Sequence, residues 1–125
     1  MTIKTVLDYI DAYKASVFPD SQKIKWLSDL DMRVDRDVIQ THQLPDDYTA
    51  FTGYAADVDT EDAVLLVTEP YDGIYIRWLE MQIDYANGDY DRYNNTAAAF
   101  SALYGDFERY YNRTHMPVGT HIKFF

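Results

Sequence analysis

Residues 93–111 read YNNTAAAFSALYGDFERYY, and their apolar side chains recur at alternating steps of four and three positions. The residues at these steps are Tyr93, Ala97, Phe100, Tyr104, Phe107 and Tyr111. Because residues three and four apart lie on the same face of an α-helix, this spacing predicts one helix with a single apolar stripe. Tyrosine rings favour burial while their hydroxyls need polar partners, so the stripe suits packing against a second helix.

The residues just before this stretch carry another aromatic-rich helical pattern, which Gly88 ends with a typical helix-stop signal. Asp89 follows directly and is a good N-cap for the next helix. Thr68 and Pro70 suit the start of the earlier helix, since proline is favoured in a first turn. The sequence therefore predicts a C-terminal helical hairpin built from residues 69–87 and 89–114.

Two more helices are predicted nearer the N-terminus. Residues 3–16 turn Val6, Leu7, Ile10 and Tyr13 inward and Lys14 outward. Residues 21–42 place one apolar stripe on a helix whose other face is charged; the stripe consists of Ile24, Leu27, Leu30, Val34 and Val38. Trp26 lies off this stripe, so it is expected either to pack on the first helix or to contact a partner.

Residues 43–63 are predicted to form a long loop, because Pro45 and Gly53 lie within turn-forming sequences. The segment from 43 to 76 contains no lysine or arginine, so the loop is strongly acidic. Tyr48, Phe51 and Tyr54 are apolar anchors that should hold the loop partly on the helices. A short β-rich run at 63–67 is expected to be extended.

Composition limits the possible classes of protein. A chain of 125 residues suits one domain, and its net charge of −10 argues against general binding to nucleic acids or anionic membranes. The absence of cysteine excludes disulfides, zinc–thiolate sites and thiol nucleophiles. No apolar run approaches the roughly 20 residues of a membrane span, and none resembles a signal peptide, so a soluble intracellular protein is expected.

The sequence predicts no catalytic residue, cofactor or metal site. The run from Asp57 to Asp62 resembles the start of a calcium-binding loop, but Asp62 stands where that loop needs glycine and Thr68 where it needs glutamate. His42, His115 and His121 lack the spacing of metal ligands, and there is neither a Gly-x-Ser-x-Gly turn nor a glycine-rich phosphate loop.

The second half of the chain resembles a known family. The similarity is closest over residues 64–117 and is carried by LLVTEPYD at 65–72, WLE at 78–80, QIDYANG at 82–88, YDRYNN at 90–95 and FERYYNRTHMP at 107–117. In these segments the chain resembles head–tail connector proteins (adaptor or head-completion proteins) of tailed phages and prophages of Gram-positive bacteria. The acidic loop departs from the family's pattern.

The resemblance implies a helical subunit that forms a homo-oligomeric ring below the portal and contacts the portal and tail-side neck proteins. DNA would pass through the ring without specific binding, and no membrane would be involved. The protein would be made in the bacterial cytoplasm and end in the virion neck. Carboxylates of the acidic loop would repel DNA; the candidates are Asp57, Asp59, Glu61 and Asp62.

A closed ring needs two unlike adhesive surfaces on each subunit, because a head-to-tail interface joins different patches. The tyrosine-rich hairpin and the apolar tail at 117–125 are the expected surfaces. The candidate contact residues are Trp26, Tyr110, Ile122, Phe124 and Phe125. The tail is expected either to fold back on its own helices or to extend onto a neighbouring subunit.

The overall expectation is one all-α domain over residues 1–125, with four helices, the C-terminal hairpin, the acidic loop and an extended tail. The main alternative function is an acidic DNA mimic that inhibits a DNA-binding protein. Lysines and arginines scattered through the helices oppose that alternative, because a mimic should present a broader, purely acidic face. A small helical enzyme without a known motif is a third possibility.

Overall fold

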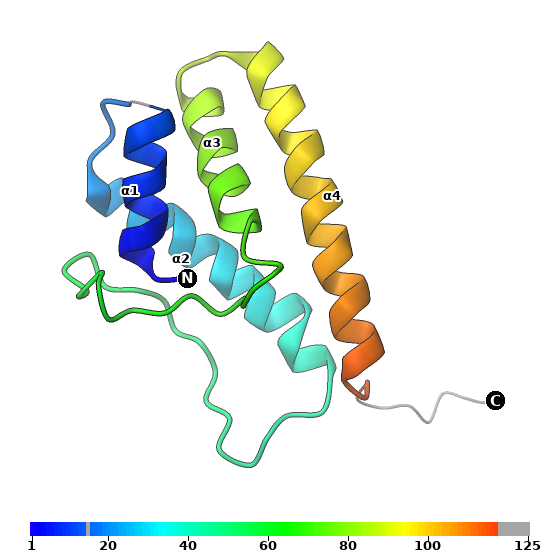
Figure 1. Cartoon of the computed structure of the whole chain (residues 1–125). Coiled ribbons are helices and arrows are strands. Elements are labelled where there is room, and N and C mark those ends of the chain that lie inside the picture. Colours follow the sequence, from blue (N-terminus) through cyan, green and yellow to red (C-terminus); the bar gives the residue numbers. More distant parts are fainter. Residues whose placement is uncertain (15, 118–125) are drawn as a thin grey trace.

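A computed structural model describes residues 1–14 and 16–117. This part of the chain is all-helical, as predicted, and contains no β-strand beyond two isolated bridges. Its elements are α1 (Ile3–Tyr13), α2 (Asp20–Asp37), the short 3-10 helix η1 (Ile39–Thr41), α3 (Ile74–Ala86) and α4 (Tyr90–Thr114). Figure 1 shows α1, α3 and α4 side by side, while α2 crosses obliquely from α1 towards the end of α4.

The predicted C-terminal hairpin is confirmed. Gly88 adopts a φ of 75°, which favours glycine, and the Asp89 side chain accepts a hydrogen bond from the Arg92 N–H at the start of α4. The tyrosine-rich stripe faces the core along its whole length. Phe100 and Phe107 are buried, and the other four stripe residues are partly buried against them.

Tyr104 is the one stripe residue whose hydroxyl is buried without a hydrogen-bond partner among the described residues. Tyr104→Phe removes an unsatisfied polar group, so it should leave stability unchanged or raise it by up to about 1 kcal/mol. Tyr75→Phe is the matched control, because the buried Tyr75 hydroxyl makes two hydrogen bonds, and it should destabilise by about 1–3 kcal/mol. Chemical denaturation of both variants measures the difference, and an equal loss in both would contradict this account.

The substitution Tyr104→Phe should also change how the stability of the fold depends on pH above about 10. Burial, with the nearby Glu108 carboxylate, raises the pKa of Tyr104 to about 12. An unfolded chain loses this proton first, near pH 10, so wild-type stability falls as the pH rises from about 10 to 12. The advantage of Tyr104→Phe should therefore grow across this window.

The hydrophobic core lies where the four helices meet and also takes in residues from the long connection. The predicted α2 stripe is buried as expected, together with Val6, Leu7 and Ile10 of α1. Leu65 and Val67, from the connection, are equally buried. Within the run at 63–67 that is predicted to be extended, Val64 forms an antiparallel bridge with Thr2 beside the first turn of α1, whereas residues 66 and 67 form a bend.

The predictions for the end of the first helix were wrong. The helix stops at Tyr13 instead of residue 16, and Tyr13 is 75% exposed, with its ring 4.5 Å from that of Tyr9. Lys14 leaves the helical conformation and points inward, where its ammonium lies 2.7 Å from a carboxylate oxygen of the buried Asp84. This ion pair joins the end of α1 to α3 and draws Lys14 away from the helical path.

The next two helices are shorter than predicted, for identifiable reasons. Helix α2 ends at Asp37 instead of residue 42, because the buried His42 folds back and its Nδ1 lies 2.7 Å from the Val38 carbonyl oxygen. Helix α3 begins at Ile74, not near 69, so Thr68 and Pro70 do not start it. The Tyr71 N–H instead donates to the Thr68 carbonyl oxygen at 3.0 Å and closes a turn, and turns and bends continue to residue 73.

None of the helices in the described ranges 1–14 and 16–117 is long and apolar enough to cross a membrane.

Candidate functional site

Two buried carboxylates on α2 hold the long connection between α2 and α3. Asp31 and Asp35 are one helical turn apart, and their exposed fractions are 0% and 2%. Both lie on the stripe that also carries Leu27, Leu30 and Val34, so the helix presents them to the interior. A buried charge is costly unless it is hydrogen-bonded, and both carboxylates are.

The Asp31 cluster consists of Asp31, Tyr54, Leu66 and Tyr75. The hydroxyls of Tyr54 and Tyr75 donate to opposite oxygens of the carboxylate, the latter at 2.6 Å, and the Leu66 N–H donates at 3.2 Å. Tyr75 also accepts a hydrogen bond from the Val67 N–H at 2.8 Å. The cluster therefore ties α2, α3 and two parts of the connection to one point.

Burial dominates the electrostatics of this cluster. It raises the pKa of Asp31, although the hydrogen bonds from Tyr54 and Tyr75 act in the opposite direction. Burial and the adjacent Asp31 carboxylate also raise the pKa of Tyr54 and of Tyr75 far above the usual range of a phenol. Both hydroxyls therefore stay protonated at neutral pH and act as donors to Asp31.

The Asp35 cluster holds the first part of the connection. Tyr48 donates its hydroxyl at 2.6 Å, Gln40 its amide at 2.7 Å, and the Phe51 N–H lies 3.3 Å from the carboxylate. Tyr48 and Tyr54 thus contact α2 through their hydroxyls and Phe51 through its backbone N–H, whereas apolar contacts were expected. Gly53 passes so close to Ser28 that a Cβ atom would lie 3.1 Å from the Ser28 Oγ, and its φ of 109° favours glycine.

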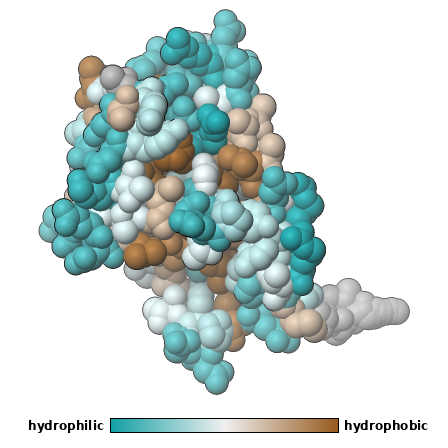
Figure 2. Space-filling model, in the orientation of Figure 1, coloured by the Kyte–Doolittle hydropathy of each residue, from teal (hydrophilic) through white to brown (hydrophobic). Residues whose placement is uncertain are grey.

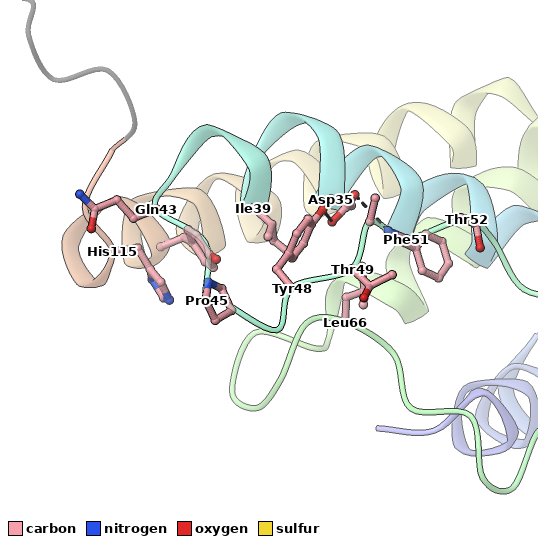
Figure 3. A pocket seen from close by; sticks show the side chains of 12 residues that line it. Asp35, Ile39, Gln43, Pro45, Tyr48, Thr49, Phe51, Thr52, Leu66 and His115 are labelled. Atoms are coloured by element: carbon pink, nitrogen blue, oxygen red, sulfur yellow. Dashed lines mark hydrogen bonds between the residues drawn. The ribbon is translucent and has the colours of Figure 1, made fainter.

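A cavity of about 520 Å³ lies beside the Asp35 cluster, between α2, the connection and the end of α4. Figure 3 shows Tyr48 reaching from the loop to Asp35 across this space. Much of the lining is apolar and comes from Ile39, Pro45, Ala50, Phe51, Leu66 and Tyr111. His115, which stacks on Tyr111 at a ring distance of 3.8 Å, completes one wall.

A second hollow, of about 320 Å³, lies between α1, α3 and α4. Met1, Tyr9, Ile76, Arg77 and Leu103 line it, and Tyr9 and Leu103 are exposed. This feature is called the α1–α3–α4 groove below. Figure 2 shows hydrophobic side chains exposed in the middle of one face of the molecule, with hydrophilic residues around them.

The structure places the predicted contact residues in different surroundings. Trp26 is partly buried against Phe18, at a ring distance of 5.4 Å, and its carbonyl oxygen accepts a hydrogen bond from the Trp78 indole. Tyr110 is partly buried and stacks on Tyr71 at 4.6 Å. Ile122, Phe124 and Phe125, with the rest of the tail after Pro117, lie outside the described residues. Their contact with a partner stays a prediction.

The four carboxylates predicted to repel DNA are all exposed. Asp59 is used locally, since its side chain accepts a hydrogen bond from the Glu61 N–H, while Asp57 and Asp62 point to solvent. Across residues 1–14 and 16–117, no group of three histidine, aspartate or glutamate side chains has an arrangement suited to a metal ion.

Sequence reasoning missed the Asp31 and Asp35 clusters. A signal was present, because both aspartates fall next to the apolar stripe on the buried face of α2, where carboxylates are uncommon. In a chain with 21 acidic residues, however, the presence of two aspartates at these positions does not stand out.

Comparison with known proteins gave no match, either to a protein-family model, to a curated protein or to a solved structure.

Proposed function

We propose that this protein is a structural subunit of the tailed-phage neck, a head–tail connector that forms a ring and joins the portal to the tail. Its partners would be further copies of itself, the portal and tail-side neck proteins. The resemblance of residues 64–117 to that family supports the proposal, as does the small helical fold. The protein would assemble in the bacterial cytoplasm and remain in the virion neck.

The α1–α3–α4 groove is the observation that carries the proposal furthest. Tyr9 and Leu103 are exposed around this hollow, next to the partly buried Ile76, and an exposed apolar surface of this kind suits a partner that covers it. The proposed occupant is the hairpin turn of a neighbouring copy. There Tyr85 and Tyr90, each 59% exposed, lie in contact at a ring distance of 5.8 Å.

Charge also favours this pairing. Arg77 lies in the groove, where it pairs with Glu80 of the same helix at 3.0 Å and is still exposed, and Asp91 is exposed in the first turn of α4, directly after Tyr90. Groove and hairpin turn are unlike surfaces, as a head-to-tail ring interface requires. The exposed carboxylates of the acidic loop would add a surface that repels the phosphates of passing DNA.

Loss of the gene provides the test in the phage or prophage that encodes this chain. We expect DNA-filled heads and separate tails to accumulate, because the joint between them would be missing, and electron microscopy would reveal this. Wild-type protein and Ala102→Asp should restore joined particles, whereas Leu103→Asp should not. The two variants add the same charge to neighbouring positions of α4, but only Leu103 lines the groove. Normal virions without the gene would contradict the proposal.

The second candidate function, an acidic inhibitor that mimics DNA, is favoured by one observation. The exposed acidic residues of the connection from 43 to 73 have no lysine or arginine between them. An inhibitor would leave virion structure unchanged when its gene is deleted. It would instead reduce DNA binding by a target enzyme in a salt-dependent manner.

A further inference from the structure

The cavity beside the Asp35 cluster has the size and lining of a binding site. Its volume of about 520 Å³ has room for several side chains, and its apolar residues come from η1, α4 and the connection. The Asp35 carboxylate at its edge already accepts hydrogen bonds from Tyr48, Gln40 and Phe51. The remaining lining therefore suits an apolar occupant.

The described chain ends at the rim of this cavity. The Gln43 N–H donates to the Met116 carbonyl oxygen at 2.7 Å, and His42 and Pro117 form an antiparallel bridge. Gln43 and His115 are themselves part of the cavity wall. Pro117 is thus fixed next to the opening, and whatever follows it begins there.

Eight residues follow Pro117, and their composition matches the cavity. Val118, Ile122, Phe124 and Phe125 are apolar, and Lys123 is the only formally charged side chain at neutral pH. At about 3.3–3.6 Å per residue, eight residues reach up to roughly 26–29 Å, which is ample for a segment that starts at the rim. Asp46 and Asp47 are exposed between two lining residues, Pro45 and Tyr48, and provide negative charge for Lys123.

We propose that residues 118–125 dock into this cavity of their own chain and cover Ile39, Pro45 and Phe51 with their apolar side chains. A segment tethered at the rim has a high effective concentration there, so it outcompetes the same segment of another molecule. The inference does not depend on the connector function. If the protein forms a ring, residues 118–125 would stay docked in the cavity until a partner displaces them.

Protection of an introduced thiol tests the docking in the full-length chain. The natural sequence has no cysteine, so Ala50→Cys places a single thiol in the cavity wall. A second protein combines it with Ile122→Asp, Phe124→Asp and Phe125→Asp, which should prevent docking. In the protein with the natural tail, we expect the thiol to react with a thiol-specific reagent at least about tenfold more slowly than in the protein with the substituted tail. A tenfold lower rate corresponds to a tail that is docked about nine-tenths of the time.

Two controls make the result decisive. Ala102→Cys, on the exposed side of α4 and outside the cavity lining, should react at the same rate with either tail. Thr49→Cys, also in the cavity wall, should repeat the protection if Ala50→Cys disturbs the fold. Equal rates with both tails at positions 49 and 50 would overturn the proposal. Protection that grows with protein concentration would also overturn it, because the occupant would then be the tail of another copy.

Discussion

Asp31→Ala should destabilise the protein by about 3–5 kcal/mol, because three hydrogen-bond donors lose their acceptor in the interior. The Ala side chain offers no acceptor to the hydroxyls of Tyr54 and Tyr75 or to the Leu66 N–H. Each buried donor left without a partner costs about 1–3 kcal/mol, partly offset because the carboxylate no longer has to be desolvated. Urea denaturation followed by circular dichroism measures the loss.

Asp29→Ala is the matched control, since Asp29 lies on the exposed side of the same helix in an ion pair with Lys25. Exposed ion pairs contribute about 0–1 kcal/mol, so this variant should remain close to wild type. A loss of less than 1 kcal/mol for Asp31→Ala would show that the Asp31 cluster does not hold the connection in place.

The loss in Asp31→Ala should also depend on pH. Because the pKa of Asp31 is raised in the folded protein, the folded state binds a proton before the unfolded state does as the pH falls. This group therefore adds stability as the pH falls through its folded pKa, down to its ordinary value of 3.8. The alanine variant lacks this gain, so the difference in stability from wild type should widen on acidification.

Phe100→Ala should cost about 3–5 kcal/mol, the range for truncating a buried aromatic side chain. Phe100 is 8% exposed at the centre of the α4 stripe, and its ring lies 5.2 Å from that of Trp78 and 5.4 Å from that of Tyr104. Removing it leaves a cavity between α3 and α4 that these neighbours can fill only in part. Thermal and urea denaturation both measure the effect.

Tyr90→Ala is the control for this prediction. Tyr90 is an aromatic residue of the same helix, but it is 59% exposed at the hairpin turn. Its truncation should cost about 1 kcal/mol or less, mostly from its contact with Tyr85. Equal losses at positions 90 and 100 would place Phe100 outside the core.

The parts of the fold that follow from local periodicity could be predicted from the sequence. The stripe from Tyr93 to Tyr111, the stop at Gly88 and the cap at Asp89 depend on neighbours within one or two helical turns, and the structure confirms them. The turn around Pro70 shows where such reasoning fails. Proline is compatible with both a first helical turn and a non-helical turn, and here the latter is found.

Features that depend on distant residues could not be predicted in this way. Lys14 leaves its helix for Asp84, which is remote in the sequence, and so its inward direction has no local signal. Asp31 and Asp35 had a local signal in their stripe positions, but their partners in the connection become apparent only once the chain is folded. The two hollows likewise exist only after separate elements meet.

The hydrogen bonds of the Asp31 cluster also bear on the order in which the chain folds. They join residues that are 23, 35 and 44 positions apart, whereas α3 and α4 are neighbours in the sequence, linked by a short turn. Closing the loops between these distant residues costs more chain entropy than closing the short α3–α4 turn, and this cost arises before the contacts can form. We therefore expect the α3–α4 hairpin to form first and the connection to close over α2 afterwards. In this sequence of events, defects at Phe100 slow folding, while defects at Asp31 mainly speed unfolding.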